Sequence, residues 1–155
     1  GASSVVTAVA VESGDEDDGG AFEPPRFTPG TIEQEYELGK MLGRGGCAVV
    51  YEATEKKTGQ RWAVKRLNKQ RVNEKMLQRE LTIMHGLKHP SIISFKEAFE
   101  SPSTVDLVIE LVEGGELFER IIRRKTFAES EVVVVVRQVM EGLAYLHARG
   151  IAHRD

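Results

Sequence analysis

The stretch LGRGGCAVVYEATEKKTGQRWAVK, residues 42–65, decides how the rest of the chain is interpreted. Residues 36–42 alternate between apolar and polar side chains, a glycine-rich turn follows, and the alternation resumes over residues 48–53. This pattern predicts two antiparallel strands joined by a glycine loop. Glycines let backbone amides approach a ligand without a Cβ in the way, and amides in a concave turn suit phosphate oxygens. A glycine turn is also an ordinary hairpin, so the glycines alone leave both interpretations open.

A third strand is expected over residues 60–67, after a turn at Thr58-Gly59. Successive side chains of a strand point to opposite faces, so Lys65 shares a face with the small Ala63. We therefore expect a lysine beside a flat apolar surface.

Several residues of this stretch resemble the glycine-rich loop and the V-A-I-K lysine of the protein kinases: Gly43, Gly45, Val50 and Ala63-Val64-Lys65. The loop is not a P-loop of the NTPase kind, because no Gly-Lys-Ser/Thr follows the glycines. The sequence departs from the kinase pattern at Ala48, where the third glycine would stand. If that position requires a positive φ, alanine costs about 1–2 kcal/mol. We expect altered closure of the loop over ATP, with nucleotide binding retained.

A helix is expected after the lysine strand, with Asn73 as its N-cap and its end near His85-Gly86. Glu80 falls within the apolar stripe of this helix, where a carboxylate is costly unless it is paired. It either reaches solvent at the edge of the stripe or pairs with Lys65, fifteen residues earlier. In protein kinases such an ion pair holds the lysine on the α- and β-phosphates of ATP. The resemblance therefore implies that Lys65 and Glu80 are paired catalytic residues.

Two further strands are expected over residues 95–99 and 105–111. The resemblance implies that Ile109 is the gatekeeper at the back of the adenine pocket and that residues 110–115 form the hinge. It also implies the following ATP-binding residues: Leu42, Gly43, Arg44, Gly45, Gly46, Cys47, Ala48, Val50, Ala63, Lys65, Ile109, Glu110, Val112 and Glu116.

The run ELVEGGELFERI, residues 110–121, is similar to the calcium/calmodulin-dependent kinase group. This resemblance implies transfer to serine or threonine rather than tyrosine, and it makes calcium and calmodulin candidate regulators. In relatives, the glutamate that matches Glu116 touches the ATP ribose and often a substrate arginine, three residues before the target hydroxyl. A glutamate in the first turn of a helix is also favoured by the helix dipole alone.

A long helix is expected over residues 127–150, although it contains five consecutive valines, residues 132–136. Valine disfavours the helix by roughly 0.6 kcal/mol relative to alanine, so the run costs about 3 kcal/mol and by itself would indicate a buried strand. The following residues, from Gln138 to His147, resemble the kinase helix that precedes the catalytic loop. We therefore predict a helix.

The chain ends with His153-Arg154-Asp155, which matches the HRD motif of the kinase catalytic loop. By resemblance, Asp155 is the catalytic base that orients the substrate hydroxyl and accepts its proton. Arg154 would pair with an activation-loop phosphate. The resemblance places the magnesium ligands beyond Asp155, so no metal site is expected within these residues, and the chain alone is expected to be inactive.

Composition sets limits on the function. The 155 residues are 41% hydrophobic and 29% charged, with a net charge of −3. Residues 1–30 hold six acidic residues and one arginine, and they predict a disordered acidic leader. The remainder is nearly balanced, which gives no argument for a nucleic-acid surface, and no run approaches membrane-spanning length. The single cysteine, Cys47, excludes an internal disulfide. A cytoplasmic setting is the simplest expectation.

These observations predict an α+β fold of the protein kinase type. Residues 31–109 would form a five-stranded antiparallel small lobe with one helix, residues 110–115 the hinge, and residues 116–155 the first helices of the large lobe. The expected function is that of part of a protein serine/threonine kinase, which transfers the γ-phosphoryl group of Mg-ATP to protein substrates. A nucleotide-binding pseudokinase or scaffold, suggested by Ala48, is the alternative.

Overall fold

The computed structural model describes residues 22–152, except residues 116 and 125. This part of the chain forms two units. One unit consists of Phe22–Leu87 and Ser94–Leu111, and the other contains Lys88–Ile93 and the chain from Val112 onward. The change from one unit to the other at Leu111 lies within the predicted hinge.

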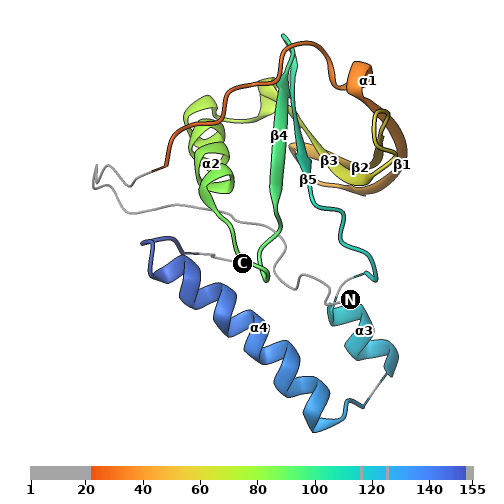
Figure 1. The fold of residues 1–155 in the computed structure, drawn as a ribbon, viewed down its shortest axis with the longest axis vertical. Coiled ribbons are helices and arrows are strands. Elements are labelled where there is room, and N and C mark those ends of the chain that lie inside the picture. The colour runs from red at the N-terminus through yellow and green to blue at the C-terminus, as the bar shows by residue number, and fades with distance from the viewer. Residues whose placement is uncertain (1–21, 116, 125, 153–155) are drawn as a thin grey trace. The chain divides into compact units, whose positions relative to one another are not determined.

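A five-stranded antiparallel sheet organises the first unit (Figure 1), as predicted. Its order is β1-β2-β3-β5-β4, so β1 and β4 are the edge strands. The strands are β1 (Tyr36–Arg44), β2 (Ala48–Glu55), β3 (Arg61–Asn68), β4 (Phe95–Glu100) and β5 (Thr104–Ile109). Every neighbouring pair is antiparallel.

The alternation of side chains in β3 supplies two separate apolar clusters. Val64 belongs to the first cluster and Leu67 to the second. The two residues are three positions apart in the strand, so their side chains point to opposite faces of the sheet. The first cluster consists of Ile32, Tyr36, Ala53, Val64, Phe99 and Val108. The second consists of Leu67, Leu77, Leu81, Ala98, Val105 and Leu107. Each fully buried aliphatic side chain contributes about 1.5–3 kcal/mol to folding, so the two clusters stabilise the packing of the sheet.

The helix α2 (Glu74–Gly86) packs on the sheet through Leu77 and Leu81, one turn apart. Asn73 caps it, as predicted, because its side-chain oxygen accepts a hydrogen bond from the Met76 amide at 3.2 Å. A short 3₁₀ helix, η1 (Lys69–Arg71), connects β3 to α2. The helix therefore begins where the sequence predicts and presents one apolar face to the sheet.

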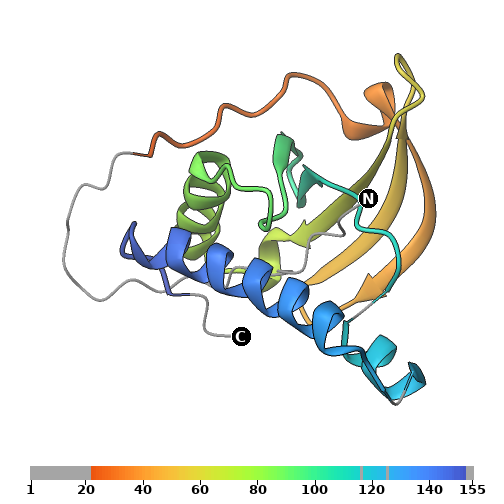
Figure 2. The same cartoon turned by 60° about the horizontal axis from the view of Figure 1, so that its bottom comes forward.

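Residues 22–35, which we call the N-terminal strap, lie against the sheet and α2 (Figure 2). The sequence-based expectation for residues 22–30 was a disordered leader. In the structure, the Thr28 amide donates a hydrogen bond to the Ala98 carbonyl of β4 at 2.8 Å, and Phe27 packs against the second cluster. The strap ends in a short helix, α1 (Ile32–Glu35), whose Ile32 is buried. Composition could not show this, because only a few apolar side chains anchor the segment.

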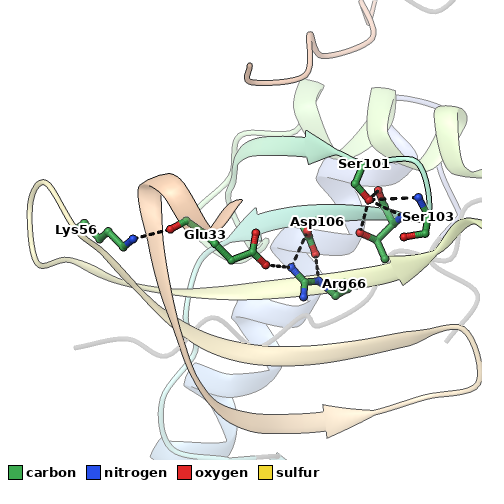
Figure 3. Close-up of polar contacts among 7 residues, drawn as sticks. Glu33, Lys56, Arg66, Ser101, Ser103 and Asp106 are labelled. Atoms are coloured by element: carbon green, nitrogen blue, oxygen red, sulfur yellow. Dashed lines mark hydrogen bonds and ion pairs between the residues drawn. The ribbon is translucent and has the colours of Figure 1, made fainter. Parts of the chain in front are cut away.

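A polar chain joins α1 to the sheet (Figure 3). Arg66 of β3 forms ion pairs with Glu33 of α1 at 2.7 Å and with the buried Asp106 of β5 at 2.6 Å. The hydrogen bond from Arg66 lowers the pKa of the Glu33 carboxyl below its usual value. The Lys56 ammonium group donates a hydrogen bond to the Glu33 carbonyl. These contacts fix α1 to β3 and to the turn that follows β2.

The second unit contains α3 (Leu117–Arg124) and α4 (Glu129–His147). The five valines lie within α4, so the predicted helix is confirmed. Flanking contacts outweigh their low propensity: the Ala128 amide donates to the Glu131 carboxylate at 3.2 Å, and Leu146 is fully buried. Much of the apolar surface of α4 is exposed, namely Val132, Val133, Val134, Val136 and Met140.

The last turns of α4 contact the segment Lys88–Ile93 of the same unit. The Tyr145 hydroxyl accepts a hydrogen bond from the Lys88 amide at 3.0 Å, and its ring lies 4.9 Å from that of His89. Within the described residues, no helix is long and apolar enough to cross a membrane.

Candidate active site

Lys65 and Glu80 form an ion pair, with the ammonium nitrogen 3.0 Å from the carboxylate Oε1. β3 presents the lysine and α2 presents the glutamate. Both side chains are about one quarter exposed, so the pair is partly shielded and still reachable from solvent. The structure therefore brings together the two residues that the sequence predicts to be paired, and it does not leave Glu80 pointing alone into solvent.

The register of the sheet places four predicted ATP-binding residues in two neighbouring pairs. Val50 of β2 lies opposite Lys65, and Ala63 lies opposite Ile109 of β5. Lys65 and Ala63 are two residues apart in β3 and share a face of the sheet. Apolar side chains of three strands thus surround the lysine, which is an arrangement that can accept a flat ring next to a charged group.

The glycine loop connects β1 to β2 as a tight turn. The Gly45 amide donates to the Ala48 carbonyl at 2.8 Å, and Gly43 lies opposite Val50 in the sheet. A Cβ added at Gly43 or Gly46 would meet no heavy atom within 4 Å. The space over these two backbone positions is therefore open on the protein side, as a loop that receives a ligand requires.

Ala48 is the first residue of β2 and pairs with Leu67 of β3. The chain is extended there, so the condition under which alanine would be strained is not met. The predicted cost of about 1–2 kcal/mol for a positive φ does not apply to this conformation. In this conformation, the replacement of the third glycine of the kinase pattern by Ala48 adds only a methyl group.

The tip of the glycine loop is tied to η1, a contact that sequence reasoning missed. The Cys47 thiol donates to the Arg71 carbonyl at 3.2 Å, and the Arg71 guanidinium donates to the Gly46 carbonyl at 3.4 Å. The Asn68 amide also donates to the Cys47 carbonyl at 3.1 Å. The residues that form these two contacts are 24 and 25 positions apart in the sequence, and no periodic pattern relates residues at such distances.

The predicted hinge starts where β5 ends at Ile109. The Glu110 amide donates to the Ser94 carbonyl at 2.9 Å, and the Glu110 carboxylate accepts a hydrogen bond from the Ser94 amide at 3.1 Å. Gly114 and Gly115 have φ values of 106° and 75°. Residues other than glycine rarely adopt these values, so the two glycines permit the turn of the chain within the predicted hinge.

Three predicted site residues, Glu116, Arg154 and Asp155, lie outside the described residues. The other predicted site residues, Leu42 to Val112, are described, and all of them except Val112 belong to the first unit. In the described part of the chain, no group of three or more histidine, cysteine or acidic residues could hold a metal ion.

The sequence pattern of the protein kinase domain matches residues 36–155, so this chain belongs to the protein kinase family. The predicted family membership is confirmed. A probable myosin light chain kinase of Dictyostelium discoideum is 49% identical over 132 residues, which are 83% of this chain and 38% of that protein.

Two other relatives indicate the same group. Human calcium/calmodulin-dependent protein kinase type IV is 42% identical over 120 residues, covering 77% of this chain and 25% of that protein. Myosin light chain kinase A of Dictyostelium discoideum is 39% identical over 127 residues, covering 80% and 43%. The chain thus spans less than half the length of these relatives, and the similarity supports the predicted resemblance to the calcium/calmodulin-dependent group.

Proposed function

We propose that this chain provides the nucleotide-binding part of an ATP-dependent protein serine/threonine kinase. The observation that carries the proposal is the Lys65–Glu80 ion pair, 3.0 Å long, next to an open glycine loop in a protein kinase domain. In this family the lysine holds the α- and β-phosphates and the glutamate fixes the lysine.

Each residue has a defined task in the proposed reaction. The Lys65 ammonium group binds phosphate oxygens, the Glu80 carboxylate orients it, and the amides of the glycine loop cover the phosphates. The hydroxyl oxygen of the substrate forms a bond to the γ-phosphorus while the bond to the ADP oxygen breaks. The hydroxyl proton passes to Asp155. A divalent metal ion, when bound, neutralises the phosphate charge.

The apolar neighbours of Lys65 fit the adenine ring in the same proposal. Val50 and Ala63 would contact its two sides, Ile109 would limit the depth of the pocket, and the backbone of Glu110 and Val112 would bind its edge. The two hydrogen bonds between Ser94 and Glu110 support this, because they fix the end of β5 that leads into the hinge.

The proposal extends to substrates and regulation. We infer transfer to serine or threonine in a protein, with an arginine three residues before the target that Glu116 recognises. Calcium and calmodulin are proposed regulators, supported by the similarity to the human type IV kinase. A cytoplasmic location is part of the proposal.

The second candidate function is nucleotide binding without phosphoryl transfer, as in a pseudokinase. One observation favours it: Ala48 replaces the third glycine of the loop pattern, and its methyl group adds bulk near the proposed phosphate path. The two functions share the nucleotide site and differ only in chemistry.

The full-length protein tests the proposal through Lys65→Met, with Lys57→Met as the matched control. Lys57 is an exposed lysine of the turn between β2 and β3. We expect Lys65→Met to lower transfer of radiolabelled γ-phosphate to a serine peptide by at least about 100-fold, and Lys57→Met to leave it unchanged. Equal transfer by both variants would exclude the assigned role of Lys65.

Calorimetric titration with ATP separates the two candidate functions. ATP binding together with Lys65-dependent transfer supports the kinase. Binding that depends on Lys65, without transfer to any serine or threonine peptide of an arrayed library, supports the pseudokinase.

A further inference from the structure

The N-terminal strap is held at three places in the first unit. Near its start, the Glu23 carbonyl lies 3.3 Å from Nδ1 of His85, in the last turn of α2. In the middle, the Thr28 amide bonds to β4. At its end, Ile32 is buried in the first apolar cluster. The strap therefore connects the end of the helix that carries Glu80 to both the edge strand and the core of the sheet.

The first residue of the strap, Phe22, packs against Gly86, where the absence of a side chain leaves room for it. A Cβ at Gly86 would lie 2.0 Å from Cδ1 of Phe22, closer than any real contact of this kind. The Phe22 ring can therefore occupy its place only because residue 86 has no side chain. Farther along the strap, Phe27 packs against the cluster that contains Leu77 and Leu81 of α2.

Thr28 makes the one side-chain hydrogen bond between the middle of the strap and the sheet among the described contacts. Its hydroxyl donates to Oε2 of Glu97 in β4 at 2.7 Å. The other oxygen of Glu97 accepts a hydrogen bond from the Tyr36 hydroxyl. Burial, with Glu97 as the second cause, raises the pKa of the Tyr36 phenol far above its usual value. Both hydroxyls are therefore neutral donors to one carboxylate.

We propose that Thr28 is a phosphorylation site and that its phosphorylation releases the strap from β4 and α2. A phosphothreonine carries a charge of about −1.5 to −2 and donates no hydroxyl proton to Glu97. The added charge would face the Glu97 carboxylate. The nearest cation of β4, Lys96, lies 2.7 Å from Glu55 and 3.9 Å from Glu97, so it is already shared between two carboxylates. Lys96 is therefore not free to neutralise the repulsion between the phosphate and Glu97.

The surroundings of Thr28 give a modifying enzyme access to it. Thr28 is half-buried, and the neighbouring Arg26, Pro29 and Gly30 are exposed. The modification is a transfer of the γ-phosphoryl group of a nucleoside triphosphate by a protein kinase that accepts threonine followed by proline. The threonine oxygen bonds to phosphorus, the bond to the diphosphate breaks, and the hydroxyl proton leaves to the base of that enzyme.

Release of the strap would loosen the end of α2 and, through it, the contact of Glu80 with Lys65. This consequence rests on the proposed function, because it is the ATP site that would be affected. The strap itself, the packing of Phe22 against Gly86 and the Thr28 contact do not depend on that function.

The test uses full-length protein with phosphothreonine incorporated at position 28 during translation, and hydrogen–deuterium exchange as the readout. Phosphothreonine at position 58 is the matched control. The Thr58 hydroxyl also donates to a glutamate, Glu55, at 2.6 Å, but it lies in the exposed turn between β2 and β3. Thr28→Val removes the hydrogen bond without adding charge.

We expect phosphothreonine at position 28 to accelerate exchange of residues 22–35 and 74–86 about tenfold, and to lower kcat/KM for ATP. Thr28→Val should have a smaller effect of the same kind, and phosphothreonine at position 58 should have none on these segments. Unchanged exchange of residues 22–35 with phosphothreonine at position 28 would overturn the proposal. Faster exchange of the strap with unchanged exchange of residues 74–86 would overturn its coupling to α2.

Gly86→Ala gives an independent check, because it displaces Phe22 without touching Thr28. Alanine favours the helix over glycine, so α2 itself should not be weakened. The variant should nevertheless accelerate exchange of residues 22–28. Slower or equal exchange would contradict the packing of Phe22 against Gly86. If Lys65→Met keeps full phosphoryl transfer, the proposed function fails, while the exchange rates still decide the role of the strap.

Discussion

Asp106 of β5 accepts two hydrogen bonds from the Arg66 guanidinium of β3, to Oδ1 at 2.6 Å and to Oδ2 at 3.0 Å. The Asp106 side chain is 6% exposed, whereas that of Arg66 is 29% exposed. The same guanidinium also reaches Glu33 of the N-terminal strap. One arginine therefore joins two adjacent strands and the short helix α1.

Asp106→Asn should destabilise the first unit by about 2–3 kcal/mol, because it removes the buried one of the two carboxylates that pair with the partly buried Arg66. Urea unfolding monitored by tryptophan fluorescence measures this, since Trp62 is the one tryptophan of the chain. The control is Arg61→Gln, which removes the pair with Glu52 from a half-exposed arginine. It should cost less than about 1 kcal/mol. Similar losses in both variants would contradict the special importance of Asp106.

Acid should destabilise the protein through Glu33 and Glu55, whose pKa values are lowered by hydrogen bonds from Arg66 and Lys96, respectively. A lowered pKa in the folded state contributes stability above the usual carboxyl pKa, and this stability is lost as the pH falls through the folded value. Glu33→Gln should therefore lose less stability than the wild type between about pH 5 and pH 3. Urea midpoints measured across this range check it.

The control for that titration is Glu37→Gln, which removes one charge from an exposed position of β1. If Glu33→Gln and the wild type lose stability in parallel as the pH falls, Glu33 does not contribute in this way.

Alanine substitutions at two glycines should affect nucleotide binding and folding stability separately. Gly46→Ala should change the free energy of unfolding by less than about 0.5 kcal/mol, since a Cβ there meets nothing within 4 Å. It should still weaken ATP binding about tenfold, because the methyl group occupies space that the phosphates need.

Gly59→Ala should show the reverse behaviour. Gly59 has a φ of 72°, so alanine costs about 1–2 kcal/mol of stability, and its turn lies in the predicted β2–β3 hairpin rather than in the glycine loop. Calorimetric titration with ATP and urea unfolding of both variants check this pair. A Gly46→Ala variant that binds ATP like the wild type would argue against phosphates at the glycine loop.

The exposed valines of α4 lower its stability. Val133 and Val134 are 46% and 52% exposed, so replacing either by alanine gains helix propensity and loses little burial. Each substitution should stabilise the helix by about 0.5 kcal/mol. Leu146→Ala, at a fully buried position, should instead cost about 2–5 kcal/mol. Thermal unfolding followed by circular dichroism measures all three, and destabilisation by Val133→Ala would mean that another surface covers this side chain.

Local sequence patterns predicted the strands and the start of α2. The alternation in residues 36–67 predicted three strands, Asn73 predicted the start of α2, and the resemblance to the protein kinases implied the ion pair of Lys65 and Glu80. Each prediction rests on side-chain periodicity or on a short motif, and both are properties of neighbouring residues. For the valines of α4, propensity favoured a strand and the family resemblance favoured a helix, and the helix was correct.

The tertiary structure alone decided the contacts between distant residues. Thr28 and Glu97 are 69 positions apart, and Arg66 and Asp106 are 40 apart. No periodic pattern relates them, because strand order and register bring them together. The path of residues 22–30 along the sheet was likewise decided by the tertiary structure, because the composition of residues 1–30 is that of a solvated tail. A few anchors, such as Ile32 in the core and Phe22 at Gly86, offset the loss of chain entropy only once the sheet and α2 have formed the surfaces that receive them.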